Sequence, residues 1–427
     1  MKVTKFMLLI TALFFLRIVF SFLTWHPDLN NHIDWGIRFY QYGPEKFYSP
    51  ESNVWSYTWP NQPPGSIYIF AITRKVFEIL FSVLWFINVH ISFFPSVLVS
   101  FSEHNLYPVL LKLPAIVADF GIAYLIFRVL KKLKNEKMAR IGAIVFLVNP
   151  VIWYNSSLWG QTDSIINFFV LLAIILLINK KLVLAILFLA ISLYIKASLL
   201  IFVPIFLVIA VLQKHSWIEW VKSVLLAAIF VGVLTLPFSR GEPFSFLIHI
   251  YKDKMFVQQM QVITANAFNI WTVLTGLHEI PQSTMFGPTS YQNWGLVLFS
   301  LTYIPTLLLV LKNKSDKLIF WALSIASFSS FMFLTNMHER YLYPLFAPLT
   351  ILLMLGEIKL PIYLIASLIN LINLYTLWWF PRFEPLVSLI VFGDYTLPRL
   401  LSLLLFLAFI YLYIGFLRLF RPLNIYF

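Results

Sequence analysis

The chain contains no cysteine and has few charged residues for its length. Charged side chains make up 11% of the 427 residues, whereas hydrophobic side chains make up 60%. Without cysteine, the chain can form no disulfides and offers no thiolate ligands to a metal ion. A water-soluble fold does not need so apolar a composition, so the sequence indicates a protein that crosses a membrane several times.

The few charges that are present are mostly positive, with 31 Lys and Arg against 18 Asp and Glu and a net charge of +13. Such a charge is also found in nucleic-acid-binding proteins, but no basic run here alternates with stacking aromatic residues in a polar context. Basic residues also hold the cytoplasmic loops of membrane proteins, where anionic head groups attract them. We therefore predict that the basic residues interact with membrane lipids and that the protein binds no nucleic acid.

Apolar segments of span length recur along the whole chain, and a chain of this length has room for about a dozen spans of roughly 20 residues. We predict an all-α polytopic membrane protein with about 12 transmembrane helices, folded as a single domain over residues 1–427. The spans are expected near residues 5–24, 108–130, 138–155, 162–179, 182–195, 198–213, 219–237, 292–311, 317–335, 341–356, 360–379 and 398–417.

Lys and Arg set the expected orientation of these spans, because they are enriched in cytoplasmic loops. With 12 spans and a cytoplasmic N-terminus, every strongly basic loop falls on the cytoplasmic side. These loops are KKLKNEKMAR (131–140), Lys180-Lys181, KNKSDK (312–317) and the C-terminal RLFRP. We predict a multi-pass protein of the cell membrane with both termini cytoplasmic. The long loops 25–107 and 238–291 are then external.

Residues 66–101, within the first external loop, fit two descriptions. They are hydrophobic enough to insert into the membrane, yet Arg74, Lys75 and Glu78 lie in the middle of the run. We predict helices that lie at the outer membrane interface. The alternative is a hairpin of two further spans, which leaves the downstream orientation unchanged because zero and two crossings have the same parity.

Polar residues gather at the expected outer ends of the spans. Asp28 and Asp34 follow the first span, and the later outer turns carry Lys112, Gln161, Asp163, Lys196, His338, Glu339 and Arg340. An ionisable group near hydrocarbon costs several kcal/mol unless it is paired or hydrated, so we expect these residues to share one polar site. Cations bind phosphate, and a carboxylate can accept a proton from a sugar hydroxyl. This combination suits sugar transfer from a lipid phosphate to a hydroxyl acceptor.

Several motifs occur in a characteristic order. They are His26-Pro27-Asp28, Trp35, GPEKFY (43–48), QPPG (62–65), KLPAIVAD (112–119), NPVIWYNSSLWGQTDS (149–164) and HERYLYP (338–344). In this order the chain resembles the glycosyltransferase C superfamily, the integral membrane enzymes that use polyprenyl-phosphate sugars. It is most similar to prokaryotic relatives of the protein O-mannosyltransferases and of the lipid-linked-oligosaccharide glucosyltransferases. Asn61 departs from the pattern, because relatives often carry an acid before this proline turn.

The resemblance implies an inverting hexosyltransferase with an external active site. Mannose or glucose would pass from a polyprenyl phosphate to a hydroxyl of a lipid, glycan or protein. A first-loop aspartate would be the general base, and the spacing to Trp35 favours Asp28 over Asp34. Asp163 would take an acid or substrate role, while Lys112, Gln161, Lys196 and the His338-Glu339-Arg340 turn would bind substrate.

Simpler interpretations of these residues stay open at this point. Asp28, Asp34 and Asp163 could each cap a helix, and Lys112 could extend to the membrane interface. His338 and Arg340 could anchor their turn at head-group level, and Asp119 is expected to be an interhelical contact. A divalent metal held by aspartate and histidine is possible, although no metal-binding motif is present.

An alternative function is a transporter or flippase of a lipid-linked sugar. Such a protein is expected to have paired broken helices and pseudo-symmetric halves with polar residues near the middle of the membrane. The sequence has no such halves, and its polar residues concentrate at one face, which favours the enzyme.

Overall fold

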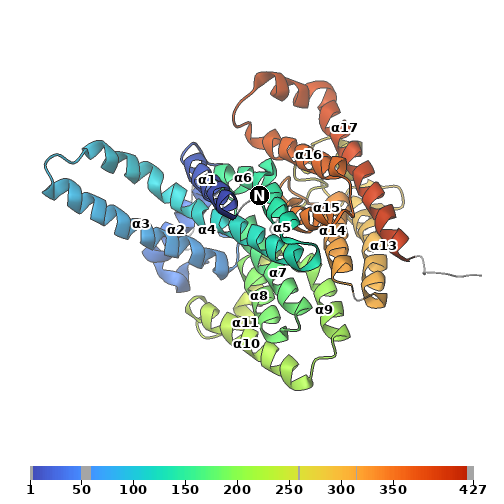
Figure 1. Cartoon of the computed structure of the whole chain (residues 1–427). Helices are drawn as coiled ribbons and strands as arrows, with labels where there is room; N and C mark the ends of the chain where they lie inside the picture. Colours follow the sequence, from blue (N-terminus) through green and yellow to red (C-terminus); the bar gives the residue numbers. More distant parts are fainter. Residues whose placement is uncertain (1–2, 50–58, 258–259, 314, 421–427) are drawn as a thin grey trace, which may run out of the picture.

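The protein is a bundle of helices (Figure 1), and its computed structural model describes residues 3–49, 59–257, 260–313 and 315–420. The α-helices are α1 (Val3–Ser21), α2 (Asp28–Lys46), α3 (Pro64–His90), α4 (Ser96–Leu133), α5 (Glu136–Val148), α6 (Pro150–Trp153), α7 (Asp163–Ile178), α8 (Leu182–Ile195), α9 (Val203–Leu212), α10 (Trp217–Thr235), α11 (Pro243–His249), α12 (Ile270–Thr275), α13 (Tyr291–Lys312), α14 (Asp316–Phe333), α15 (Phe346–Leu355), α16 (Leu360–Trp378) and α17 (Glu384–Leu417).

Shorter elements connect these helices. They are the π-helical turns η2 (Tyr154–Trp159) and η5 (Ile250–Val257), the 3₁₀ turns η3 (Ala197–Phe202), η4 (Leu236–Phe238), η6 (Tyr343–Leu345) and η7 (Arg418–Phe420), and the strands β1 (Met285–Phe286) and β2 (Thr289–Ser290). The two strands pair antiparallel, with Met285 opposite Ser290. Four parts of the predicted loops lie outside the described residues: positions 50–58, positions 258–259, Lys314, and Arg421 with Pro422.

The prediction of an all-α polytopic membrane protein is confirmed. Within the described residues, seven helices are long and apolar enough to cross a membrane. The bent pair of residues 136–148 and 150–159 would make an eighth span. Shorter apolar helices occupy the other four predicted segments, at residues 163–178, 182–195, 197–212 and 343–355.

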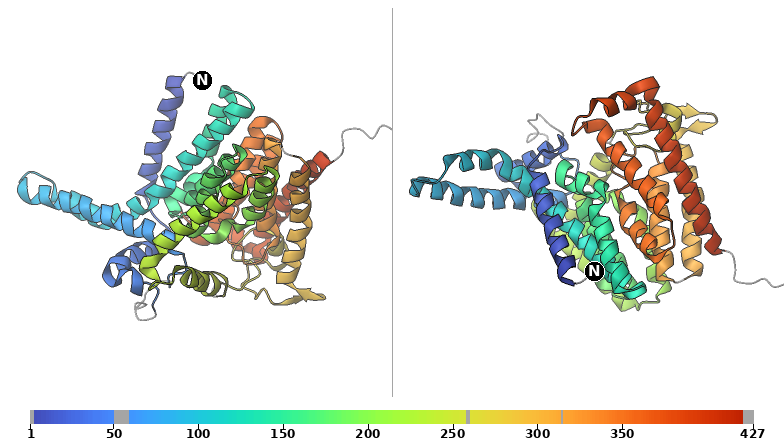
Figure 2. Two further views of the ribbon diagram at one scale, coloured as in Figure 1. Left: turned by 90° about the horizontal axis from the view of Figure 1, so that it is seen from below. Right: turned by 45° about the horizontal axis from the view of Figure 1, so that its top comes forward.

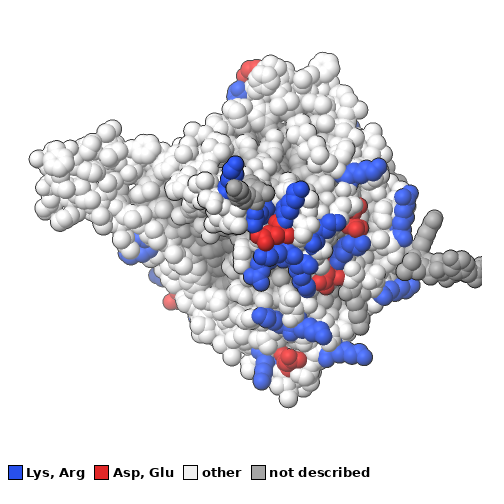
Figure 3. Space-filling model, viewed as in Figure 1, with Lys and Arg blue, Asp and Glu red and all other residues white. Residues whose placement is uncertain are grey.

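One end of the bundle carries much of the positive charge. The view in Figure 1 looks onto this end, and Figure 3 shows Lys and Arg gathered there in the same orientation. The N-terminus and the turn between α4 and α5 lie together at this end (Figure 2). Lys132 in α4 reaches Asp316 at the start of α14 at 3.1 Å. The grouping is the one that the positive-inside rule leads us to expect for a cytoplasmic face.

A long helical hairpin, made of α3 and the first part of α4, projects from the bundle. In Figure 2 it extends sideways, across the direction in which α1 runs. Arg74 and Glu78 form an ion pair at 3.0 Å on α3, while apolar side chains such as Trp85 and Phe86 are exposed. Helices that lie along a membrane surface have this orientation, and their interfacial placement stays a prediction.

Helix α14 lies at the centre of the core. Every side chain from Leu318 to Phe333 is buried. Its residues are apolar or small on all sides, which is typical of a helix that other helices surround. Because α14 is fixed in this way, the turn that follows it, with Glu339 and Arg340, has a rigid support.

A buried ion pair links α1 to α4 beneath that turn. Arg17 Nη1 lies 2.5 Å from Asp119 Oδ2, and Ser156 Oγ donates to the same oxygen at 2.6 Å. Tyr343 Oη donates to the other carboxylate oxygen. The expectation that Asp119 is an interhelical contact is confirmed. Through Tyr343, the network also fixes the segment that carries Arg340.

We expect the substitution Arg17→Met to lower stability strongly. Removing one partner leaves the Asp119 carboxylate charged and buried, which costs about 3–5 kcal/mol. A double variant that also carries Asp119→Leu should lose less stability than Arg17→Met alone, because no buried charge is left. Thermal unfolding of the purified protein, followed by tryptophan fluorescence, measures the stability of the single and the double variant. Additive losses from the two substitutions would show that the pair is not coupled.

Candidate active site

The candidate site lies at the end of the bundle opposite the basic one, where α1 ends and α7 begins. Asp28 is the first residue of α2, directly after the turn that follows α1. This turn is joined to the end of η2, because the His26 backbone N–H donates to the Trp159 carbonyl at 3.2 Å. The first loop and the WGQTD segment are therefore held against each other.

The turn after η2 presents Gln161 to Asp28. Gly160 has φ +91°, a left-handed conformation that glycine adopts without steric cost. A Cβ at this position would lie 3.0 Å from the Leu29 side chain. The turn aims Gln161 at α2, and its Nε2 donates to Asp28 Oδ2 at 2.7 Å.

A second ion pair lies beside this turn. Asp163 opens α7, and Lys196 directly follows α8. Lys196 Nζ donates to Asp163 Oδ1 at 2.8 Å, and both side chains are almost fully buried. A paired arrangement of this kind removes much of the cost of placing charge inside an apolar bundle.

Arg340 joins the two parts of the site. Its Nη1 lies 3.8 Å from Asp28 Oδ2, and its Nε lies 3.9 Å from Asp163 Oδ2. The same Nη1 donates to Glu339 Oε1 at 2.7 Å. Residues from the first loop, the WGQTD turn, the end of α8 and the HERY turn thus form one group. We call this group the cluster, and its members are Asp28, Gln161, Asp163, Lys196, Glu339 and Arg340.

The large loop 238–291 supports the HERY turn. The Ala265 backbone N–H donates to the Met337 carbonyl at 3.0 Å, and Asn373 Nδ2 donates to the Asn266 carbonyl at 2.6 Å. From the other side, Asn370 Nδ2 donates to the Glu339 carbonyl at 2.8 Å. Ala265 and Asn266 of this loop are thus held beside the HERY turn.

Exposure separates the three carboxylates of the cluster. The side chain of Asp28 is 36% exposed, whereas those of Asp163 and Glu339 are 6% and 1% exposed. A molecule arriving from outside can therefore reach Asp28 directly. Asp163 and Glu339 instead face the cations Lys196 and Arg340.

The surroundings of Asp28 keep it ionised. Burial alone would raise its pKa, but the hydrogen bond with His26 and the positive charge of Arg340 outweigh that effect. The resulting pKa lies well below the ordinary value for aspartate. For Glu339, burial dominates over the attraction of Arg340 and raises the pKa.

Two histidines beside the cluster are neutral at physiological pH. Burial, with contributions from Lys196 and Arg340, lowers the pKa of His32 to about 3 against the opposing charge of Asp28. Burial and Arg340 lower the pKa of His338 to about 3 as well. His338 therefore brings no positive charge to a phosphate at neutral pH. Its predicted role in substrate binding stays a prediction.

His32 was not among the predicted site residues. It lies four positions after Asp28 on α2, so the two side chains share one face of the helix. Its ring stacks on Phe70 with centroids 4.3 Å apart. The four-residue spacing between Asp28 and His32 was the signal in the sequence that could have identified His32, had this segment been recognised as a helix.

We expect His32 to make stability depend on pH. Because its folded pKa of about 3 lies below the ordinary 6.5, the unfolded chain binds more protons between these values, and stability falls as pH falls from 6.5. At pH 5 the resulting loss in the free energy of unfolding is at most about 2 kcal/mol. The melting temperature should therefore drop more between pH 7 and pH 5 in the native protein than in His32→Gln. Equal drops would contradict a buried neutral His32.

Asp34 lies apart from the cluster. Six positions along α2 turn its side chain about 120° away from Asp28, and it faces Arg38 at 3.7 Å. Burial raises the pKa of Asp34 to about 6, although Arg38 opposes the change. A carboxylate with this pKa accepts protons readily, but the structure brings neither Lys196 nor Arg340 to it among the described contacts.

The interpretation that Asp28 and Asp163 cap their helices is wrong. The residue before α2 is Pro27 and the one before α7 is Thr162, and neither helix has a side-chain cap hydrogen bond. Asp28 and Asp163 are instead the first residues inside their helices. There they face the positive end of the helix dipole, while their oxygens are shared with Gln161, Lys196 and Arg340.

Lys112 belongs to the framework of the protein and not to the cluster. Its Nζ donates to the carbonyls of Ser21 at 2.8 Å, Ser157 at 3.0 Å and Thr24. An ammonium group has three N–H donors, so these three carbonyls use them all. Lys112 is also fully buried, which contradicts the interpretation that it extends to the interface. The structure therefore removes it from the phosphate-binding candidates.

Several buried donors around the site have no hydrogen-bond partner among the described residues, and two of them lie close together. These two are Arg340 Nε and Trp159 Nε1, and the Arg340 guanidinium lies 6.0 Å from the Trp159 ring. Unpartnered buried donors cost free energy, so they often mark the place of a ligand. Within the described part of the chain, no group of three or more His, Asp or Glu is placed to hold a metal ion.

The cluster thus combines a partly exposed carboxylate with buried cations at one end of an apolar bundle. Residues 161–275 match the model of a protein family described as ALG3 protein. That family consists of membrane glycosyltransferases that use dolichyl-phosphate mannose. The matched segment holds Gln161, Asp163 and Lys196 but is less than a third of the chain. No curated protein matches the chain.

Proposed function

We propose that the protein transfers a hexose from a polyprenyl-phosphate donor to a hydroxyl acceptor, with inversion and with Asp28 as the general base. The ALG3 similarity supports mannose over glucose as the sugar, and a glycan as the acceptor. The motif order supports a glycosyltransferase C-like enzyme. The face opposite the basic end, external by the positive-inside rule, would carry the active site.

One observation carries the proposal: the partly exposed carboxylate of Asp28 lies beside the guanidinium of Arg340. A base has to reach the acceptor hydroxyl, and Asp28 is the carboxylate of the cluster that an acceptor can reach. A leaving phosphate needs positive charge within the same site, and Arg340 with Lys196 supplies it. Asp28 and the cations lie within one cluster, as a single displacement requires.

The chemistry follows from these positions. Asp28 accepts the proton of the acceptor hydroxyl while the hydroxyl oxygen forms a bond to the anomeric carbon of the donor. The bond from that carbon to the phosphate oxygen breaks, and the polyprenyl phosphate leaves with the electron pair. Its negative charge is stabilised by Arg340 and Lys196. A single displacement of this kind inverts the anomeric centre.

Charge balance explains why the site holds several carboxylates. Lys196 is paired with Asp163, and Arg340 is paired with Glu339 and lies near Asp28 and Asp163. A donor phosphate would compete with these carboxylates for the cations. Arg340 Nε makes no hydrogen bond to the described residues, and a guanidinium can bind two phosphate oxygens at once.

The test is a transfer assay with purified protein in lipid nanodiscs. Dolichyl-phosphate [³H]mannose and dolichyl-phosphate [³H]glucose are supplied separately with a lipid-linked glycan pool as acceptor. We expect label to move from the mannose donor to the pool, with release of dolichyl phosphate. Movement of intact donor between leaflets of proteoliposomes, without transfer to any acceptor, would instead support the flippase.

A further inference from the structure

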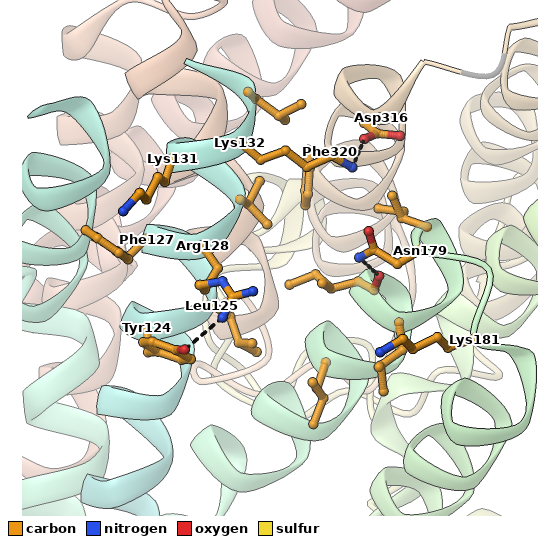
Figure 4. Close-up of a pocket in the computed structure, with 16 residues that line it drawn as sticks. Tyr124, Leu125, Phe127, Arg128, Lys131, Lys132, Asn179, Lys181, Asp316 and Phe320 are labelled. Atoms are coloured by element: carbon orange, nitrogen blue, oxygen red, sulfur yellow. Dashed lines mark hydrogen bonds and ion pairs between the residues drawn. The ribbon is translucent and has the colours of Figure 1, made fainter. Parts of the chain in front are cut away.

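A cavity of about 860 Å³ lies at the basic end of the bundle, away from the candidate active site. It opens between the last turns of α4, the last turns of α7 and the start of α14 (Figure 4). This volume lies within the range that small-molecule and cofactor sites occupy. No step of the proposed transfer uses it.

The wall and the rim of this cavity differ in chemistry. The wall is apolar, formed by residues such as Leu125, Leu172, Leu176 and Phe320. The polar lining, which we call the rim, carries the cations Arg128, Lys131, Lys132 and Lys181, together with Asn179 and one carboxylate, Asp316. In Figure 4, Arg128 and Lys181 extend toward the cavity from opposite sides.

Two of the rim cations are available to a ligand. Lys132 is paired with Asp316 at 3.1 Å and Lys131 with Glu136 at 3.5 Å. Among the described residues, the Arg128 side chain donates a hydrogen bond to the Tyr124 hydroxyl and lies over the Tyr124 ring. Neither Arg128 nor Lys181 has a carboxylate partner there.

We propose that this cavity binds an anionic phospholipid, with the head-group phosphate between Arg128 and Lys181 and an acyl chain against the apolar wall. Basic pockets between transmembrane helices on the cytoplasmic side bind anionic head groups in this manner. A free phosphate would gain nothing from the apolar wall. The site is independent of the proposed transferase function, since it lies at the other end of the bundle.

The test compares lipid binding to the purified protein in detergent by native mass spectrometry. Phosphatidylglycerol and phosphatidylcholine with identical acyl chains are titrated separately. We expect the native protein to prefer phosphatidylglycerol, and the variant Arg128→Gln/Lys181→Gln to lose this preference, by roughly fivefold for each cation. Lys222→Gln, which removes an exposed lysine of α10 outside the cavity, should keep it. Equal binding of both lipids to the native protein would overturn the proposal.

A second variant distinguishes a cavity that binds a lipid from one that binds a free anion. Leu176→Trp fills part of the apolar wall and should weaken the binding of both phospholipids while the rim charge is unchanged. Inorganic phosphate should not displace phosphatidylglycerol at millimolar concentration. If phosphate displaces it and Leu176→Trp binds as the native protein does, the site takes free phosphate and the proposal fails.

Discussion

The substitution Asp28→Asn is expected to reduce kcat by about 10²–10⁴-fold, the range that a general base contributes. Asparagine keeps the size of the side chain and a hydrogen bond with Gln161, but it cannot accept the proton of the acceptor hydroxyl. The KM for the donor should stay the same or fall, because Arg340 loses a carboxylate 3.8 Å away that competes with phosphate. Initial rates with labelled donor measure both constants.

Asp34→Asn is the matched control for this experiment. It makes the same change in the same helix, but Asp34 faces Arg38 and not the cluster. We expect this variant to keep most of its activity. Full activity in Asp28→Asn together with a large loss in Asp34→Asn would move the base to Asp34, whose pKa of about 6 would then become functionally relevant.

Arg340→Ala is expected to reduce kcat/KM by roughly 10–150-fold, the equivalent of about 1.5–3 kcal/mol for a hydrogen bond to a charged group. Both constants should change. KM rises because the phosphate loses its ligand, and kcat falls because Arg340 also stabilises the charge of the leaving group. The removal also leaves Asp28, Asp163 and Glu339 facing one another without the cation between them.

Two further variants keep this prediction falsifiable if the alanine variant unfolds. Arg340→Lys retains the charge but loses the planar fork, so it should recover part of the loss in KM. Arg382→Ala removes an exposed arginine that lies before α17 and pairs with Glu384, the first residue of that helix. This variant should behave as the native protein. An unchanged kcat/KM in a folded Arg340→Ala variant would exclude Arg340 from the donor site.

The spans and the approximate outline of the site follow from the sequence. Hydrophobic runs of 14 to 23 residues are restricted to helices in a bilayer, because the backbone must satisfy its hydrogen bonds internally. The scarcity of charge also made the cluster predictable in outline. Ionisable groups such as Lys196 and Arg340 lie at the ends of apolar segments, and pairing them in one place has the lowest cost.

Individual partners were harder to predict, because they depend on how the helices pack. Arg17 lies inside an apolar run, and nothing in its neighbourhood shows that Asp119 lies across the helix interface. Lys112 has the sequence context of an interfacial lysine, yet three carbonyls from α1, its following turn and η2 surround it. The neutral state of His338 follows from its burial, which no local pattern reveals.

The anomeric configuration of the transferred sugar tests the proposed mechanism most directly. Nuclear magnetic resonance of the product, compared with that of the donor, determines it. With Asp28 as base and no enzyme nucleophile, one displacement occurs at the anomeric carbon, so the product should have the configuration opposite to that of the donor. A product with retained configuration would require two displacements through a covalent intermediate and would contradict the role proposed for Asp28.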